Sequence, residues 1–459
     1  MNSAHRSFMA LGAATLTLAG CGKISPISAP ALRSGSADFS VVAAMGTSIS
    51  TGYQSGGVVD NHQDKSFPDL FANHVGASSF TIPSISADGI PPLLQIVSLN
   101  PLVINNTGRP LGAPTNFAQP SAYHNMAIPG ALLFDVADSS AYHTSPNPVG
   151  RTNFTYFTLI QRSRGTILEQ VASRAPTFIT FEYGANEALG YATSGGAIAL
   201  FPSATFAALL TGTLNGLQAL IPGAKVAMFN VPDVTSIPFF TTFPPYVLDA
   251  SGNPVFVGGV PLTLIGHEGA GDAPLGPGDL VLLTAASALA AGDGFPIGQY
   301  SYLTGAPGTG VALENSKVLS AGEVTTVQTA ISAYNAAIAS EATTRGLALV
   351  DLNALLRQAA TVGLEYRGST YTSAFLTGGL FSLDGVHPND FAHGILCNAL
   401  IAAVNRQFGS NIAPLDLSTV ATFSSSRARP SGGGPVLPWI RNEDEGLAQL
   451  FPWKKAPAL

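Results

Sequence analysis

The sequence predicts an α/β fold in which helices cover both faces of a parallel central sheet, and two observations support this class. Four apolar runs, each of a length that suits a strand buried on both faces, lie at residues 39–45, 177–183, 225–231 and 347–352. Helical patterns separate these runs, and strands that alternate with helices favour a three-layer α/β/α arrangement. Ligands of such sheets bind beyond the carboxyl ends of the strands, so the chemistry is expected there.

The first strand is expected at Phe39–Met45, because this apolar run ends at Gly46. A helix at Ile167–Arg174 then leads into the second run, and a helix at Ala204–Leu220 leads into the third. A last helix is expected at Phe391–Phe408, after the fourth run. This order supplies the crossover helices that parallel neighbours in a sheet require.

The helix before the fourth strand has the clearest start and stop signals. Ser320 and Glu323 have the spacing of a capping box, and Gly346 stands where a helix C-terminus favours glycine. Apolar residues recur between them at the spacing of one helix face, at Val324, Val327, Ile331, Tyr334 and Ile338. The helix is expected to lead directly into the strand at 347–352.

One segment interrupts the alternation of strands and helices. Residues 236–315 are dense in Gly and Pro and include Phe239, Phe240, Phe243 and Tyr246. So long an irregular stretch inside a domain is usually functional or forms a small subdomain. Two interpretations are open: a lid or acyl-binding wall near the site, or structural padding beside the sheet. We expect one domain over residues 38–412 with this segment as an insertion, followed by a C-terminal tail at 413–459.

Composition excludes some classes of function. Charged residues make up 10% of the 459 residues, and the net charge is −7 with only 20 Lys and Arg. Nucleic-acid binding depends on clustered cations, so we expect no nucleic-acid partner. The 49 Gly and 33 Pro indicate many loops, but no collagen-like period is present.

The N-terminus has the features of an export signal. A short basic start is followed by an apolar stretch from Ser7 to Ala19 and then by Leu18-Ala19-Gly20-Cys21. This ending resembles the lipobox of bacterial lipoproteins, which implies that residues 1–20 are a signal peptide and that Cys21 carries the lipid. An ordinary signal cleaved near Ala19 or Gly20 is the alternative.

Residues 21–37 are rich in Ser, Ala and Pro and are expected to form a flexible tether. The resemblance to lipoproteins implies an exported protein anchored to the cell envelope, at the outer membrane or the cell surface, and facing the periplasm or the exterior. We expect the protein to be a monomer. Lipidation of Cys21 would leave Cys397 alone, and in a helix that thiol is expected to be a small buried apolar group.

Polar residues that suit acyl transfer follow the predicted strands. Ser48 comes just after the first strand and is a candidate nucleophile. Asp384 lies three residues before His387 on a short segment ahead of the last helix, where it can orient the imidazole as a general base. Asn186 follows the second strand and can donate to an oxyanion, and Gly130 offers an unobstructed backbone N–H on another loop.

Taken together, and in their chain order of Ser48, Gly130, Asn186 and His387, these four stretches resemble the SGNH hydrolases, also called the GDSL esterase/lipase family. The resemblance implies a flavodoxin-like three-layer sandwich that hydrolyses carboxylic esters. It also implies that Ser48 is the nucleophile, His387 the base and Asp384 its orienting carboxylate. The Ser48 and Gly130 N–H groups and the Asn186 amide would form the oxyanion hole.

Two residues depart from the family pattern. Thr47 stands where the family usually has the Asp of Gly-Asp-Ser, and Glu187 stands where an Asp usually follows the family's oxyanion-hole Asn, which corresponds to Asn186 here. Neither change removes a group that transfers a proton or stabilises the oxyanion, but both bear on how the serine loop is positioned. The mature histidines show no metal-ligand spacing, so we expect no metal and no cofactor, and His393 is expected on a helix surface.

Three other functions remain open from the sequence. A carbohydrate O-acetyl esterase would use the same residues with a preference for acetyl groups. An acyltransferase would pass the acyl group from Ser48 to an alcohol in place of water. A surface-binding lipoprotein without turnover is the third, which Thr47 and Glu187 leave conceivable. No Gly-x-Ser-x-Gly elbow is present, which argues against an α/β-hydrolase.

Overall fold

The computed structural model describes residues 32–99, 102–138, 154–249, 251–268 and 271–420. The predicted signal peptide, Cys21, most of the predicted tether and residues 421–459 of the predicted tail lie outside these ranges. None of the described helices is both long and apolar enough to cross a bilayer.

The centre of the fold is the parallel sheet that the apolar runs predict. Its four strands are β1 (Val42–Met45), β4 (Phe178–Phe181), β5 (Lys225–Phe229) and β12 (Ala348–Val350), in the order β1-β4-β5-β12 with every pair parallel. A short stretch around Asn125 continues the sheet beside β1, where it bridges Ala44. With this stretch the order is that of a flavodoxin-like sheet.

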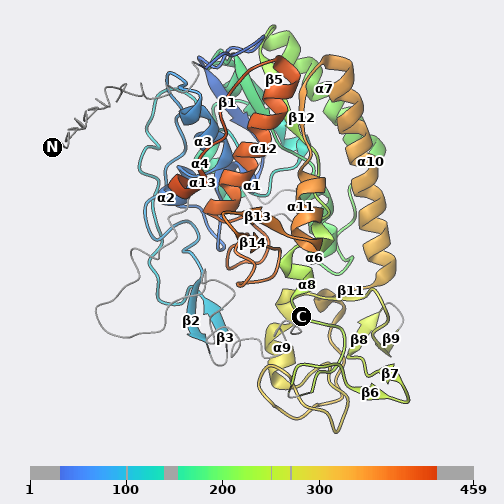
Figure 1. The fold of residues 1–459 in the computed structure, drawn as a ribbon. Coiled ribbons are helices and arrows are strands. Elements are labelled where there is room, and N and C mark those ends of the chain that lie inside the picture. Colours follow the sequence, from blue (N-terminus) through green and yellow to red (C-terminus); the bar gives the residue numbers. More distant parts are fainter. Residues whose placement is uncertain (1–31, 100–101, 139–153, 250, 269–270, 421–459) are drawn as a thin grey trace, which may run out of the picture.

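Helices cover both faces of this sheet, which makes three layers (Figure 1). The helices on one face are α4 (Phe154–Ile160), α5 (Ile167–Ala172), α6 (Ala185–Thr193), α7 (Ser203–Leu220) and α10 (Ala321–Arg345). The other face is covered by α3 (Phe67–His74) and α12 (Asp390–Phe408), and α11 (Leu352–Thr361) lies at the β12 edge. The predicted α/β class is therefore confirmed.

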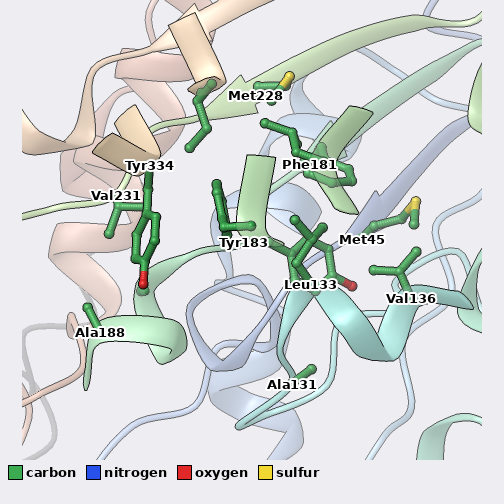
Figure 2. Packing of buried hydrophobic residues seen from close by; sticks show 14 of the residues in the cluster. Met45, Ala131, Leu133, Val136, Phe181, Tyr183, Ala188, Met228, Val231 and Tyr334 are labelled. Carbon is green, nitrogen blue, oxygen red and sulfur yellow. The ribbon is translucent and has the colours of Figure 1, made fainter. Parts of the chain in front are cut away.

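Alternation along the strands divides the apolar residues between two cores. In β1, Met45 belongs to the core under α7 and α10, whereas Val42 belongs to the core under α3 and α12. Figure 2 shows part of the first core, to which three strands contribute Met45, Phe181 and Met228 and α10 contributes Tyr334. Because helices cover both faces of the sheet, the sequence of each strand is a continuous apolar run and does not alternate between apolar and polar residues.

The end signals of α10 act as the sequence predicts. The Ser320 hydroxyl accepts from the Glu323 N–H, and the Glu323 carboxylate accepts from the Ser320 N–H at 2.8 Å. At the other end Gly346 has a φ of 64°, a left-handed conformation that favours glycine. These caps fix where the helix begins and ends, and hence where β12 starts.

The insertion forms a small subdomain with its own apolar core, built around residues such as Phe243, Leu264 and Phe295. Its elements are α8 (Pro238–Thr241), β6 (Phe256–Val257), β7 (Val260–Pro261), β8 (Ile265–Glu268), β9 (Gly271–Pro274), β10 (Leu280–Val281), α9 (Ala286–Ala291) and β11 (Val318–Leu319). The subdomain lies beyond the carboxyl edge of the sheet (Figure 1). It is attached there by the Phe239 N–H, which donates to the Gly385 carbonyl at 2.8 Å.

Two hairpins and two terminal segments complete the described chain. The hairpins, which the sequence analysis does not predict, are β2–β3 (Gln95–Leu99 and Leu102–Asn105) and β13–β14 (Leu364–Tyr366 and Ser369–Tyr371). A short helix α2 (Asp60–Gln63) lies near the start of the chain. At the far end α13 (Leu417–Val420) packs on α12 beside Gly394, so the ordered structure continues past residue 412.

The expectation for His393 is wrong, because α12 buries this residue completely. The helix lies against α3, and the imidazole stacks on Phe67 with ring centroids 6.5 Å apart. Neither ring nitrogen has a hydrogen-bond partner. Burial lowers the pKa of His393 to about 4. Cys397, on the same helix, is buried as predicted.

We expect His393→Leu to make the protein less sensitive to acid. The pKa of His393 is lower in the folded state than in the unfolded chain, so between pH 6.5 and 4 only the unfolded chain takes up this proton. The neutral, buried His393 therefore lowers the free energy of unfolding by an amount that grows as the pH falls through this window and reaches about 2 kcal/mol at pH 5. Thermal unfolding at pH 7.5 and pH 5 measures the effect. His267→Gln, at an exposed histidine, is the control. If Tm falls between pH 7.5 and pH 5 by the same amount in His393→Leu as in the wild type, the prediction is contradicted.

Candidate active site

The first site loop connects β1 to a short helix. Helix α1 (Ser48–Thr51) begins at Ser48, directly after the strand, and ends at Gly52 with a φ of 75°. The Thr51 hydroxyl donates to the Ser48 carbonyl at 2.7 Å, which closes this single turn. The Ser48 side chain therefore stands at the carboxyl edge of the sheet, where the sequence places it.

The second loop brings a histidine and an aspartate from the other end of the chain. His387 Nε2 lies 2.9 Å from Ser48 Oγ, and His387 Nδ1 lies 2.9 Å from Asp384 Oδ2. Both side chains of this pair are mostly buried, with exposures of 14% for His387 and 13% for Asp384. The structure thus joins the three residues Ser48, His387 and Asp384 in one chain of hydrogen bonds.

Asp384 is the most heavily hydrogen-bonded group of the site. Its Oδ1 accepts from the Ser382 hydroxyl at 3.0 Å and from the backbone N–H groups of Val386 and His387 at 2.9 Å. Its Oδ2 accepts from His387 and from the Gly56 N–H at 3.0 Å. Burial alone would raise the pKa of Asp384, but nearby His387 and these donors outweigh it and hold the pKa at about 2. The carboxylate is therefore ionised at neutral pH.

Reciprocal hydrogen bonds hold the two loops against each other. The Ser55 N–H donates to the Ser382 hydroxyl at 2.9 Å, and the Leu383 N–H donates to the Ser55 hydroxyl at 3.3 Å. The ring of Tyr53 packs on the His387 imidazole with centroids 4.5 Å apart. Burial, and next the charge of Asp384, raise the pKa of Tyr53 to about 12. The imidazole is thus confined between an aromatic ring and a carboxylate.

A second polar cluster connects the same loops near the start of α12. Asp390 Oδ1 lies 2.7 Å from both His62 Nδ1 and Gln54 Nε2, and its Oδ2 lies 3.6 Å from Lys65 Nζ. Burial would raise the pKa of Asp390, but His62, Lys65 and Gln54 bring it below its ordinary value. This cluster links α12, which begins at Asp390, to the segment that follows the serine.

The two remaining predicted residues lie on neighbouring loops. Asn186, near the start of α6, donates from Nδ2 to the Ala131 carbonyl at 2.8 Å, which places its amide next to the Gly130 loop. Gly130 has a φ of 77°, in the region that favours glycine. The backbone N–H groups of Ser48 and Gly130 have no acceptor among the described residues. The Gly130 loop is fixed to the sheet by the Ile128 N–H, which donates to the Gly46 carbonyl at 3.0 Å.

Sequence reasoning missed the carboxylate that contacts the serine loop. Glu182 follows β4 and is buried, and it accepts from the Thr47 N–H at 3.0 Å, from the Thr47 hydroxyl and from the Ser50 hydroxyl. Burial raises the pKa of Glu182 to about 7, although these donors lower it in part. The available signal was a single acidic residue inside the otherwise apolar run at 177–183.

Glu187 also has a defined place. Its carboxylate is buried and accepts from the Leu133 N–H at 2.6 Å, at the start of the turn that follows the Gly130 loop. Burial raises the pKa of Glu187 to about 7. Both departures from the family pattern therefore lie within hydrogen-bonded supports of the site loops.

An apolar cavity of about 90 Å³ lies beside the two site loops. Ile49 follows the serine, Val386 and Pro388 flank the histidine, and all three line the cavity. The rest of its wall comes from α11, α12 and neighbouring loops, and every lining residue is apolar. In the described part of the chain no group of three or more His, Cys, Asp or Glu residues has the geometry to hold a metal ion.

Fold and site together define an α/β protein with a serine, a histidine and an aspartate hydrogen-bonded at the carboxyl edge of a parallel sheet. Residues 42–400 match the family model described as GDSL-like Lipase/Acylhydrolase. The chain therefore belongs to this family, and hydrolysis of ester bonds is its general activity.

Two solved structures are similar to this chain at low identity. One is phospholipase A1 from Streptomyces albidoflavus NA297, with 12% identity and a TM-score of 0.33, covering 80% of this chain and 98% of the other. The second is an extracellular lipase from Streptomyces rimosus, with 13% identity, the same TM-score of 0.33, and the same coverage of 80% and 98%. No curated protein matches the sequence.

Proposed function

We propose that the protein hydrolyses carboxylic esters through an acyl-enzyme on Ser48. The observation that carries this proposal is the pair of 2.9 Å contacts that connect Ser48 Oγ to His387 Nε2 and His387 Nδ1 to Asp384. This is the arrangement of a nucleophile, its general base and the group that orients the base. Asp384 is ionised and keeps the proton on Nδ1, so Nε2 is the nitrogen that accepts.

The reaction then runs in two halves. Ser48 Oγ attacks the ester carbonyl carbon while Nε2 of His387 takes the hydroxyl proton, and the imidazolium returns that proton to the leaving alcohol as the C–O bond breaks. Water attacks the acyl-enzyme in the second half, again with His387 as base, and releases the carboxylic acid and the Ser48 hydroxyl. The Ser48 and Gly130 N–H groups and the Asn186 amide are the donors proposed for the oxyanion of each tetrahedral intermediate.

Acyl groups longer than acetyl are the proposed substrates, because the cavity beside Ile49, Val386 and Pro388 is apolar throughout. A chain of methylene groups gains free energy from leaving water for such a wall, whereas an acetyl group has little surface to bury. A lipid or another fatty-acyl ester is therefore favoured over an acetylated glycan.

A panel of p-nitrophenyl esters from acetate to dodecanoate, run in parallel on the wild type and Ser48→Ala, tests this function. We expect Ser48-dependent turnover with kcat/KM at least about tenfold higher for medium chains than for acetate. Ala359→Leu fills part of the cavity and is expected to lower kcat/KM for decanoate about tenfold while acetate is unaffected. Ala360→Leu, on the exposed side of the same helix, is the matched control.

The possible outcomes separate the candidate functions. A steep preference for acetate would contradict the fatty-acyl proposal and indicate an O-acetyl esterase. Ester products formed from an added alcohol in place of free acid would indicate a transferase. Absence of both turnover and Ser48 labelling by an organophosphonate would contradict catalysis itself.

A further inference from the structure

We propose that Glu182 is a positioning residue for the nucleophile, and that with Thr47 it forms a donor–acceptor pair that sets the conformation of the Ser48 loop. This proposal rests on the proposed function of Ser48. The carboxylate that supports the loop comes from the end of β4, while the residue just before the nucleophile supplies a hydroxyl and a backbone donor.

The contacts of Glu182 lie on both sides of Ser48. Thr47 Oγ1 lies 3.1 Å from Oε1 and 3.0 Å from Oε2, and the Thr47 N–H lies 3.0 Å from Oε2. Three residues after Thr47 comes Ser50, whose hydroxyl donates to Oε2 at 3.0 Å. One buried carboxylate thus holds the residue before the nucleophile and the residue two positions after it.

These contacts bear directly on the reacting groups. The peptide that joins Thr47 to Ser48 carries the Ser48 N–H, so the torsion angles of Thr47 set where this proposed oxyanion donor points. Thr47 is extended, with φ −114° and ψ −153°, and leaves the strand at once for helix α1. A displacement of about 1 Å in such a group costs on the order of 10²-fold in rate.

The packing around the carboxylate leaves it little freedom. Thr47, Ser50 and Glu182 are all buried, and the Glu182 N–H donates to the Met45 carbonyl at 3.0 Å across the sheet. A Cβ atom on Gly46 would collide with the Ser50 side chain, which explains a glycine at this position. The carboxylate and the loop residues that contact it are therefore packed together away from solvent.

Exchanging the two side chains tests the pair. Glu182→Thr alone is expected to lower kcat for p-nitrophenyl butyrate about 10²-fold, with KM within about threefold of the wild type. Thr47→Asp alone places two carboxylates against each other in a buried site and is also expected to lower kcat. The double variant Thr47→Asp/Glu182→Thr restores one carboxylate to the pair, and its kcat is expected to lie within about tenfold of the wild type.

Rate constants for Ser48 labelling by an organophosphonate provide a second readout, because labelling reports the alignment of the nucleophile without the deacylation step. Glu182→Gln keeps an acceptor for the Thr47 N–H and is expected to retain more activity than Glu182→Thr at unchanged Tm. Asp69→Asn is the matched control, because Asp69 is a buried carboxylate on α3 whose pKa burial raises to about 7, and it bonds Asn73 instead of the loop.

Folded Glu182→Thr with wild-type kcat and labelling rate would overturn the proposal, as would a double variant no more active than Glu182→Thr. If Glu182→Thr does not fold, the double variant is compared with Thr47→Asp instead, and a double variant no more active than Thr47→Asp would overturn the proposal. A wild type that neither hydrolyses esters nor labels at Ser48 would instead contradict the proposed function, and the role of Glu182 with it.

Discussion

Replacing Ser48 by alanine is expected to lower kcat for p-nitrophenyl butyrate by about 10⁴- to 10⁶-fold. The variant loses the atom that attacks the carbonyl, whereas the proposed oxyanion donors and the apolar cavity remain, so KM is expected to change little. The side chain is small and nearly buried, and its Oγ is hydrogen-bonded to His387, so its loss leaves the packing of α1 intact. Steady-state kinetics with thermal unfolding of the same preparations measure both effects.

Ser78→Ala is the matched control for this variant. The Ser78 hydroxyl is exposed and donates to the Ser40 carbonyl, at the opposite end of β1 from the site. We expect wild-type kinetics there. Retained turnover by a folded Ser48→Ala variant, free of contaminating esterase, would rule out the nucleophile assignment and with it the acyl-enzyme.

Asp384→Asn is expected to lower kcat by about 10⁴-fold at neutral pH. The substitution keeps the size of the side chain but removes the charge that stabilises the imidazolium, and the amide can force the proton of His387 onto the wrong nitrogen. The carboxylate accepts hydrogen bonds from several groups of the loop, so the variant is also expected to lose stability, measured as a lower Tm.

The low pKa of Asp384 also sets how acid affects the fold. The pKa of Asp384 is lowered from 3.8 to about 2 in the folded protein, so the ionised carboxylate stabilises the fold fully above pH 3.8. This contribution to the free energy of unfolding is lost as the pH falls through 2. Asp351→Asn serves as control, since that carboxylate lies at the same edge of the sheet but caps α11 through the Ala354 N–H. A wild-type kcat in Asp384→Asn would show that another group orients the imidazole.

The sheet and its main helices could be predicted because their signals are local. A strand that is dry on both faces is a continuous apolar run, and α10 has a capping box at Ser320 and a glycine at Gly346. The hairpins β2–β3 and β13–β14 escape such reasoning because they are short and lie outside the central sheet. The core of the insertion escapes it as well, since its apolar residues have no regular spacing.

The reacting residues of the candidate site could be predicted from the sequence, but most of the residues that hold them in place could not. The order of the motifs along the chain identifies Ser48, Asn186 and His387, which lie next to the ends of strands or helices. Gly56 donates to Asp384 from a distant loop, and nothing local marks it. The burial of His393 depends on α12 packing against α3, which is a tertiary contact that a helical periodicity does not reveal.

The hydrogen bond between Ser48 and His387 joins residues that are 339 positions apart in the chain. A nascent polypeptide that has reached Val350 contains every strand of the sheet and the serine loop, yet it has neither the histidine nor its aspartate. Contacts of such long range form late, because loop closure must precede them. Under the proposed mechanism, ester hydrolysis therefore reports that the chain has been made at least as far as His387. A fragment that ends ahead of Asp384, left by interrupted synthesis or by proteolysis, would carry an inert serine.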